Sequence, residues 1–320
     1  MNRTGKIWLI IAIALLLIGG VIFAVSYSSS GFDLGKLGAD KFVTNTYDFE
    51  EDFSDISIRT TTAKLIFEPA EDGKCRVVCY EAEKQRHSVS VSNGTLTIDS
   101  KDSRKWYEKF GSFSFENAKL TIYLPESSYR SLSIETSTGD VIMPEGFAFD
   151  TVTVKGSTSG VTWRSAAGSL DIDVSTGGIL LDGISADRIT VKTTTGGITL
   201  NSLACTNALE LSASTGGILL TDASCGSLTA KTSTGHVRCV RTVSAGALRI
   251  ETSTGDVKFE SCDAAELYVK TSTGDITGTL LTEKVFITDS STGRINVPDT
   301  TAGGMCELRT STGDIRISLG

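Results

Sequence analysis

The sequence predicts an all-β protein whose main part is a parallel β-helix, or β-solenoid, of about ten coils of 18–20 residues each. Three observations lead to this fold class. A Ser-Thr-Gly-Asp motif recurs at a nearly constant interval, apolar and polar residues alternate on both sides of it, and the charge at one exposed position alternates in sign almost throughout the coils.

The repeat is seen in its fullest form at Thr252-Ser253-Thr254-Gly255-Asp256. A solenoid is indicated by a period this short and regular, because each coil is too small to bury its apolar face alone. We name each coil after the central Ser or Thr of its motif, which occurs at Ser137, Ser157, Ser175, Thr194, Ser214, Ser233, Ser253, Ser272, Ser291 and Ser311.

Each coil has a pattern typical of half-buried strands. In the Ser253 coil, Leu248 and Ile250 alternate with polar residues before the motif, and Val257 and Phe259 do so after it. A weaker apolar position follows nine residues past the central serine. Three inward-facing sides predict a roughly triangular coil.

The chain has to turn sharply at each motif, and glycine accepts the positive φ that such a corner requires. The alternation also turns Thr252 and Thr254 inward, where a hydroxyl can bond to the backbone of the corner. The structural corner residues predicted in this way are Gly139, Gly177, Gly196, Gly216, Gly235, Gly255, Gly274, Gly293 and Gly313.

The exposed position two residues before the central Ser or Thr forms a column of charges. Its members, in sequence order, are Glu135, Lys155, Asp173, Lys192, Ser212, Lys231, Glu251, Lys270, Asp289 and Arg309. In stacked strands they would lie about 4.8 Å apart, where opposite charges stabilise by about 0.2–1 kcal/mol per pair. The alternation therefore favours in-register stacking over a chance distribution of surface charges.

The N-terminal part predicts export. An uncharged apolar run is long enough to span a bilayer as a helix, and Arg3 and Lys6 before it favour a cytoplasmic N-terminus. A signal peptide cleaved after Ala24-Val25-Ser26 is the alternative, although the run is longer than an ordinary signal sequence. The predicted segments are residues 1–6, cytoplasmic; 7–27, transmembrane helix; 28–41, linker; 42–130, irregular β cap; and 131–320, extracellular solenoid.

The cap region contains turn and strand signals of its own. Asn93-Gly94 predicts a two-residue hairpin between two alternating runs. The stretch Ile56–Phe67 matches the coil template with Ala63 in place of the corner glycine. We therefore expect a degenerate first coil here.

The run Lys119–Pro125, then Leu132–Val141 and the serial Ser-Thr-Gly-Asp coils, resembles a bacterial β-strand-repeat family. That family is known as putative adhesins of undetermined function and includes membrane-anchored envelope proteins of Firmicutes. The resemblance covers about residues 42–320. It implies a β-solenoid ectodomain linked to adhesion or envelope stress, and it supplies no catalytic residues.

The seven cysteines follow the core pattern more closely than a disulfide framework. Cys239 takes the place that Phe259 has in its coil, so buried free thiols are expected. Cys205 and Cys225, in adjacent coils, form the best candidate for a disulfide. No Cys/His spacing resembles a zinc site.

Catalytic chemistry finds little support. His236 occupies a corner, which predicts a solvated turn residue, and no Ser-His-Asp arrangement is suggested. Asp256 and Asp275 stack in consecutive coils, as a glycosidase pair or a cation site would require. Arg294 and then Asp314 are expected next in that column, so charge compensation is the preferred interpretation. No catalytic, cofactor or metal residue is assigned.

The net charge of −8 disfavours a nucleic-acid partner. The regular pattern and the anchor predict a non-enzymatic cell-surface module for adhesion, binding or scaffolding, without a cofactor, whose partner is an unknown envelope protein or surface polysaccharide. Two alternatives are an envelope-stress regulatory membrane protein and a polysaccharide-active β-helix enzyme, the latter by fold analogy only.

The last coil in the sequence is expected to be the open end of the solenoid. Ile315 and Ile317 would then be exposed on an unpaired rung. Arg309, Asp314 and Arg316 bring charge to this edge and favour a protected edge over a docking site for a partner or a second copy.

Overall fold

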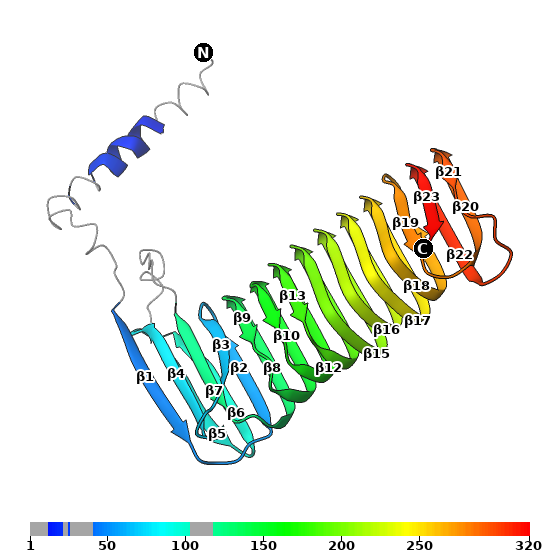
Figure 1. Cartoon of the computed structure of the whole chain (residues 1–320). Coiled ribbons are helices and arrows are strands. Elements are labelled where there is room, and N and C mark those ends of the chain that lie inside the picture. The colour runs from blue at the N-terminus through cyan, green and yellow to red at the C-terminus, as the bar shows by residue number, and fades with distance from the viewer. Residues whose placement is uncertain (1–11, 22–24, 26–40, 103–117) are drawn as a thin grey trace. The chain divides into compact units, whose positions relative to one another are not determined.

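The structure is a computed structural model that describes residues 12–21, 25, 41–102 and 118–320 (Figure 1). The chain divides into two units, residues 1–41 with 103–116, and residues 42–102 with 117–320. In the first unit residues 12–21 are helical. The second unit carries the strands and the core, and each unit is considered by itself.

The predicted membrane segment, residues 7–27, lies partly outside the described residues. Residues 1–6 and nearly all of the predicted linker 28–41 lie outside them as well. No helix within the described ranges combines the length and the apolar character needed to cross a membrane. The anchor therefore stays a prediction.

The second unit is all-β. Its strands are β1 (Phe42–Phe49), β2 (Asp55–Thr60), β3 (Lys64–Pro69), β4 (Cys75–Ala82), β5 (Gln85–Ser92), β6 (Thr95–Asp102), β7 (Lys119–Leu124), β8 (Ser128–Thr138), β9 (Val141–Met143), β10 (Ala148–Thr158), β11 (Val161–Trp163), β12 (Ala166–Thr176), β13 (Ile179–Asp182), β14 (Ser185–Thr195), β15 (Ile198–Thr215), β16 (Ile218–Thr234), β17 (Val237–Thr254), β18 (Val257–Lys270), β19 (Ile276–Leu280), β20 (Lys284–Thr292), β21 (Ile295–Asn296), β22 (Gly304–Thr312) and β23 (Ile315–Leu319).

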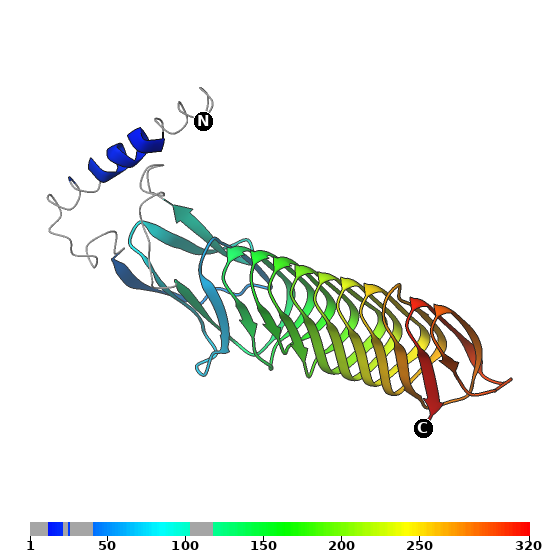
Figure 2. The same ribbon diagram turned by 90° about the horizontal axis from the view of Figure 1, so that it is seen from above.

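The predicted parallel β-helix is confirmed, with about nine turns. The strand before each motif pairs in parallel with the same strand of the next coil, so that Leu132 aligns with Val152 and Val152 with Leu170. Figure 2 shows the coils as a row of similar loops. From β15 to β18 each strand continues through a corner, so that one strand covers more than one side of its coil.

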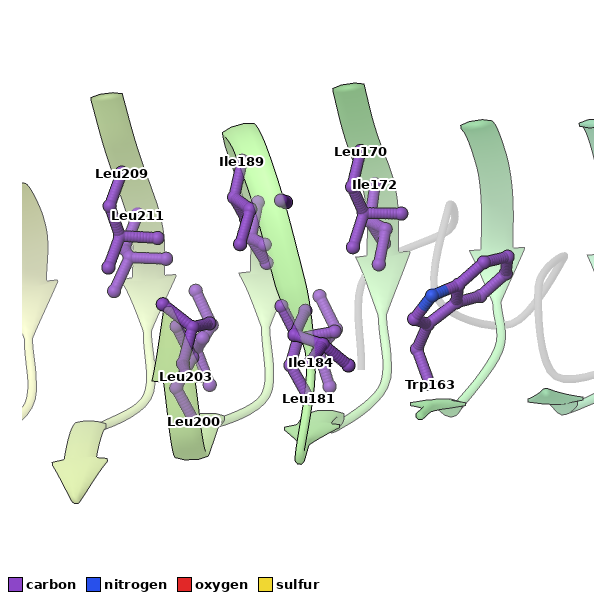
Figure 3. Packing of buried hydrophobic residues seen from close by; sticks show 14 of the residues in the cluster. Trp163, Leu170, Ile172, Leu181, Ile184, Ile189, Leu200, Leu203, Leu209 and Leu211 are labelled. Atoms are coloured by element: carbon purple, nitrogen blue, oxygen red, sulfur yellow. The ribbon is translucent and has the colours of Figure 1, made fainter. Parts of the chain in front are cut away.

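The core is the interior of this row of coils. Leu170 and Ile172 point inward from one side, Leu181 from the second and Ile184 from the third, and all four are buried (Figure 3). The predicted three-sided coil is thus present. Trp163 fills the core of its coil, and its indole N–H donates to the carbonyl of Ser165 at 2.7 Å.

The column of charges lies on one face, as in-register stacking requires. Glu135, Lys155 and Asp173 are neighbours in register. Further along, Lys231 aligns with Glu251, their side chains form an ion pair of 3.1 Å, and Glu251 aligns with Lys270. The stacking order predicted from the sequence holds from the Ser137 coil to the Ser272 coil.

The predicted degenerate first coil consists of β2 and β3. Ile56 aligns with Leu132, and Leu65 with Val141. On its other side β6 and β7 continue the parallel rows, and β5, β4 and β1 follow as antiparallel strands. Asn93 and Gly94 form the hairpin between β5 and β6, both with positive φ.

At the other end the order of the coils differs from the prediction. β18 pairs with β22 and β19 with β23, whereas β20 and β21 pair with the far sides of β22 and β23. The Ser311 coil, last in the sequence, therefore lies between the Ser272 and Ser291 coils. In Figure 1, β23 lies between β19 and β21. Lys270 consequently aligns with Arg309 and not with Asp289. Asp289 aligns with Arg309 from the other side of the Ser311 coil.

The prediction of an open rung at Ile315 and Ile317 is therefore wrong, because these side chains are 0% and 6% exposed. The physical reason lies in the composition of the two coils. The Ser311 coil directs Leu308 and Ile315 inward, whereas the Ser291 coil has Thr288 in the position that corresponds to Leu308. Placing the more apolar coil between two others buries more apolar surface.

Candidate functional site

Eight of the nine predicted corner glycines share one backbone conformation, with φ between 144° and 156°. The exception is Gly293, in the terminal Ser291 coil, which does not have this positive φ. Close packing also requires glycine at these corners. A Cβ on Gly255 would lie 2.1 Å from the carbonyl oxygen of Gly235 in the adjacent coil. The corners are therefore fixed by backbone geometry and by contact between coils.

A buried threonine stabilises many of these corners. The hydroxyl of Thr252 donates to the carbonyl of Gly235 at 3.3 Å, and that of Thr271 donates to the carbonyl of Gly255 at 3.1 Å. The inward position predicted for Thr252 is correct. The one predicted for Thr254 is wrong, because its side chain is exposed.

The Ser157 coil lacks a corner glycine and differs from the other coils at two positions. Gly156 stands where most coils have the buried threonine, and Ser159 stands at the corner. The Oγ of Ser159 lies 3.0 Å from the position that a Cβ on residue 156 would take. The serine side chain therefore fills the space that glycine leaves. Within the described residues, the hydroxyls of Ser159 and Thr136 are buried without a hydrogen-bond partner.

The corner carboxylates have a structural role. Asp256 accepts a hydrogen bond from the amide of Asp275 at 2.9 Å, and Asp275 accepts one from the amide of Asp314 at 2.8 Å. Asp314 accepts from the amide of Arg294. The predicted order is corrected here, since Asp314 precedes Arg294 in the column. The part of the chain that the structure describes holds no group of three or more His, Cys, Asp or Glu that could bind a metal.

A second corner, which the sequence analysis missed, lies eight residues past the central Ser or Thr. Gly183, Ser202, Asp222, Arg241 and Ser261 all have φ between 45° and 67° there. Only one of the five is glycine, so composition gave no signal. Asp222 and Arg241 form a two-pronged ion pair at 2.6 and 2.7 Å across adjacent coils.

The seven cysteines are buried and free, as predicted. Burial raises the pKa of Cys75, Cys79 and Cys306 to about 12, because a thiolate is poorly solvated in the core. Cys205 and Cys225 align in adjacent coils, but each sulfur contacts a backbone carbonyl instead of the other sulfur. The native thiols are thus unreactive core residues.

A buried polar cluster joins the cap to the first coil. Glu81 accepts from His87 twice, from the backbone amide and from Nδ1, each at 2.7 Å. Its other oxygen accepts from the side-chain amide of Asn45 at 2.7 Å. The Nε2 of His87 and the hydroxyl of Thr60 share a hydrogen bond of 3.0 Å. The cluster therefore links β1, β4 and β5 to β2.

The order Thr60–His87–Glu81 is that of a nucleophile, a base and an orienting carboxylate, which the sequence analysis did not expect. The exposed fractions are 5% for Thr60, 7% for His87 and 0% for Glu81. A substrate atom would need access to the Thr60 oxygen, so the arrangement fits a structural clamp. Strand alternation was the available signal, because Cys75, Cys79 and Glu81 share the inward face of β4.

A surface groove of about 490 Å³ lies beside the clamp. Glu135, Lys155 and Asp173 of the charge column line it, together with Arg59, which aligns with Glu135. Apart from Gly156, the remaining lining residues are serines and threonines, among them Thr136, whose hydroxyl has no hydrogen-bond partner in the described part of the chain. The groove therefore offers donors and acceptors repeated at the spacing of the coils, about 4.8 Å.

Comparison with known proteins agrees with this architecture. The model of the Toastrack DUF4097 family matches residues 53–318. A search of curated proteins gives no match.

Solved structures with 14% sequence identity are similar in fold. One, described as a putative adhesin from Parabacteroides distasonis, covers 87% of this chain and 98% of its own, with a TM-score of 0.52. A putative lipid binding protein from the same species covers 86% and 97%, with a TM-score of 0.51. A putative adhesin from Parabacteroides merdae covers 77% and 98%, also at 0.51.

Proposed function

The chain belongs to the Toastrack DUF4097 family, and we propose that its solenoid is a non-enzymatic binding or scaffold module of a bacterial envelope. A solenoid of stacked coils gives a long, rigid surface on which the same side-chain positions repeat. The cluster that most resembles catalytic machinery, Thr60–His87–Glu81, is buried, and this burial supports a structural role for it.

The groove beside the first coils is the observation that carries this proposal. Lys155 lies between Glu135 and Asp173 in register, so charges of both signs alternate along the groove. Serine and threonine residues also line the groove. Such a lining matches a polar polymer that has donors and acceptors along its length. A surface polysaccharide is therefore the proposed ligand, and an envelope protein with a polar segment is the alternative partner.

The proposed location follows from the N-terminal sequence. The apolar run of residues 7–27 would hold the chain in the cell membrane as a single span. Arg3 and Lys6 favour a cytoplasmic N-terminus, which would leave the solenoid outside the cell. The groove would then be accessible to envelope polymers outside the membrane.

Lys155→Ala is expected to weaken binding of purified envelope polysaccharide about tenfold, because hydrogen bonds to charged groups contribute about 1.5–3 kcal/mol each. Lys192→Ala is the matched control, since Lys192 occupies the same column outside the groove. We expect the control to change the dissociation constant less than about twofold. Biolayer interferometry on the immobilised chain would measure both constants.

Two outcomes would contradict the proposal. Equal losses in both variants would show that the groove is not the binding surface. Release of reducing ends from the polysaccharide, abolished by His87→Ala in a folded variant, would show that the clamp is catalytic and the module an enzyme.

A further inference from the structure

The end of the solenoid formed by the Ser291 coil collects exposed apolar side chains. In residues 41–102 and 118–320, the large apolar side chains that are clearly exposed are Val243, Leu281, Val285, Ile287 and Ile295, with exposed fractions of 39–47%. Four of these five belong to residues 281–295. Such a concentration at one place is typical of an interaction surface.

The same end has an open strand edge. β20 pairs with β22 on one side, and no strand within the described residues pairs with its other side. Soluble proteins usually protect such an edge with lysine, proline, a bulge or a covering segment. Between Val285 and Thr292 the edge has a single charged residue, Asp289, and no proline. The unpaired backbone groups and the exposed apolar side chains therefore form one accessible strip.

We propose that β20 pairs antiparallel with β20 of a second copy of this chain, centred on Ile287. The new pair would satisfy the open backbone groups of both copies and bury Val285 and Ile287 of each against the other. An antiparallel pair uses the same strand on both sides, so it is two-fold symmetric and closes as a dimer instead of a fibre.

The charge pattern of the edge favours this partner and this register. Centring on Ile287 places Asp289 opposite Val285 of the second copy, and no like charges face each other. Centring on Phe286 would instead place Asp289 opposite Glu283, which like-charge repulsion disfavours. The favoured register also keeps the apolar side chains of both copies contiguous.

Ile287→Cys in the full chain tests this pairing, because residue 287 would face its own copy across the two-fold axis. Mild oxidation should yield a disulfide-linked dimer on a non-reducing gel. The native thiols are buried and give a low background. Val243→Cys is the matched control, since Val243 is equally exposed but lies in β17, which pairs on both sides. The control should stay monomeric on the gel.

A second measurement does not depend on cysteine chemistry. Light scattering of the full chain in detergent should show a dimer, and Ile287→Lys should raise its dissociation constant about 30-fold. Since Ile287 is half exposed, the variant should keep its circular dichroism spectrum. A wild-type chain that stays monomeric at high concentration, or equal linking of the two cysteine variants, would overturn the proposal.

Discussion

Gly255→Val is expected to lower the free energy of unfolding by at least about 3 kcal/mol. The φ of 150° at Gly255 is unfavourable for a β-branched residue. In addition, the new Cβ would lie 2.1 Å from the carbonyl oxygen of Gly235, a backbone atom that cannot move without separating the coils. The displaced corner would also weaken the hydrogen bond that the Gly255 carbonyl accepts from Thr271.

Gly178→Ala is the matched control for this substitution. Gly178 follows a corner glycine, has no positive φ, and the nearest atom to a Cβ there would be 3.9 Å away. Its replacement should change the free energy of unfolding by less than about 1 kcal/mol. Urea denaturation followed by circular dichroism measures both. Similar stabilities of the two variants would show that the corner does not require glycine.

Glu81→Ala should lower the free energy of unfolding by about 3–5 kcal/mol, the range found when one partner of a buried ion pair is removed. The substitution leaves the amide of Asn45 and the imidazole of His87 without their acceptor in the interior of the protein. Glu83→Ala is the control, because Glu83 is exposed and lies two residues after Glu81, in the connection between β4 and β5.

The loss should be local, because each coil of a solenoid contacts only its neighbours. Hydrogen exchange is expected to increase in β1 and β5, which the clamp holds, and to stay unchanged in β16 and β17. Uniformly faster exchange along all coils, or an equal effect of the control, would contradict the role of the clamp.

Local pattern was sufficient to predict most of the fold. Period-two alternation placed Leu170 and Ile172 inward, and the glycine present in most motifs located the corner there. Both signals act within one coil, so they do not depend on how the coils are ordered. The charge column added information between coils, and it was correct as far as Lys270.

The order of the last two coils was missed because the Ser291 and Ser311 coils share one template. Their difference is visible only in the inward positions, where Thr288 takes the place of an apolar residue, and in the outward position of Ile287. A coil whose inward face is less apolar is suited to the open end, where less apolar surface is buried. The predicted contact of Lys270 with Asp289 was an inference from sequence order, which chain threading does not have to follow.

The clamp was missed for a different reason. Glu81 and His87 lie on strands whose alternation points them inward, yet charged residues in the interior are rare enough that the sequence alone favours exposure. Thr60 lies in another strand, and its approach to His87 depends on how the cap folds over the first coil. Such a contact between distant segments has no signal in local pattern.

The order of the coils at the distal end decides which edge is open, and cross-linking measures it directly. Lys270→Cys with Arg309→Cys should form a disulfide, because the two positions are aligned on adjacent parallel strands about 4.8 Å apart. Lys270→Cys with Asp289→Cys should not, since Arg309 lies between them and the separation is about 9.6 Å. Linking of the second pair and not the first would contradict the insertion of the last coil and return the open edge to Ile315 and Ile317.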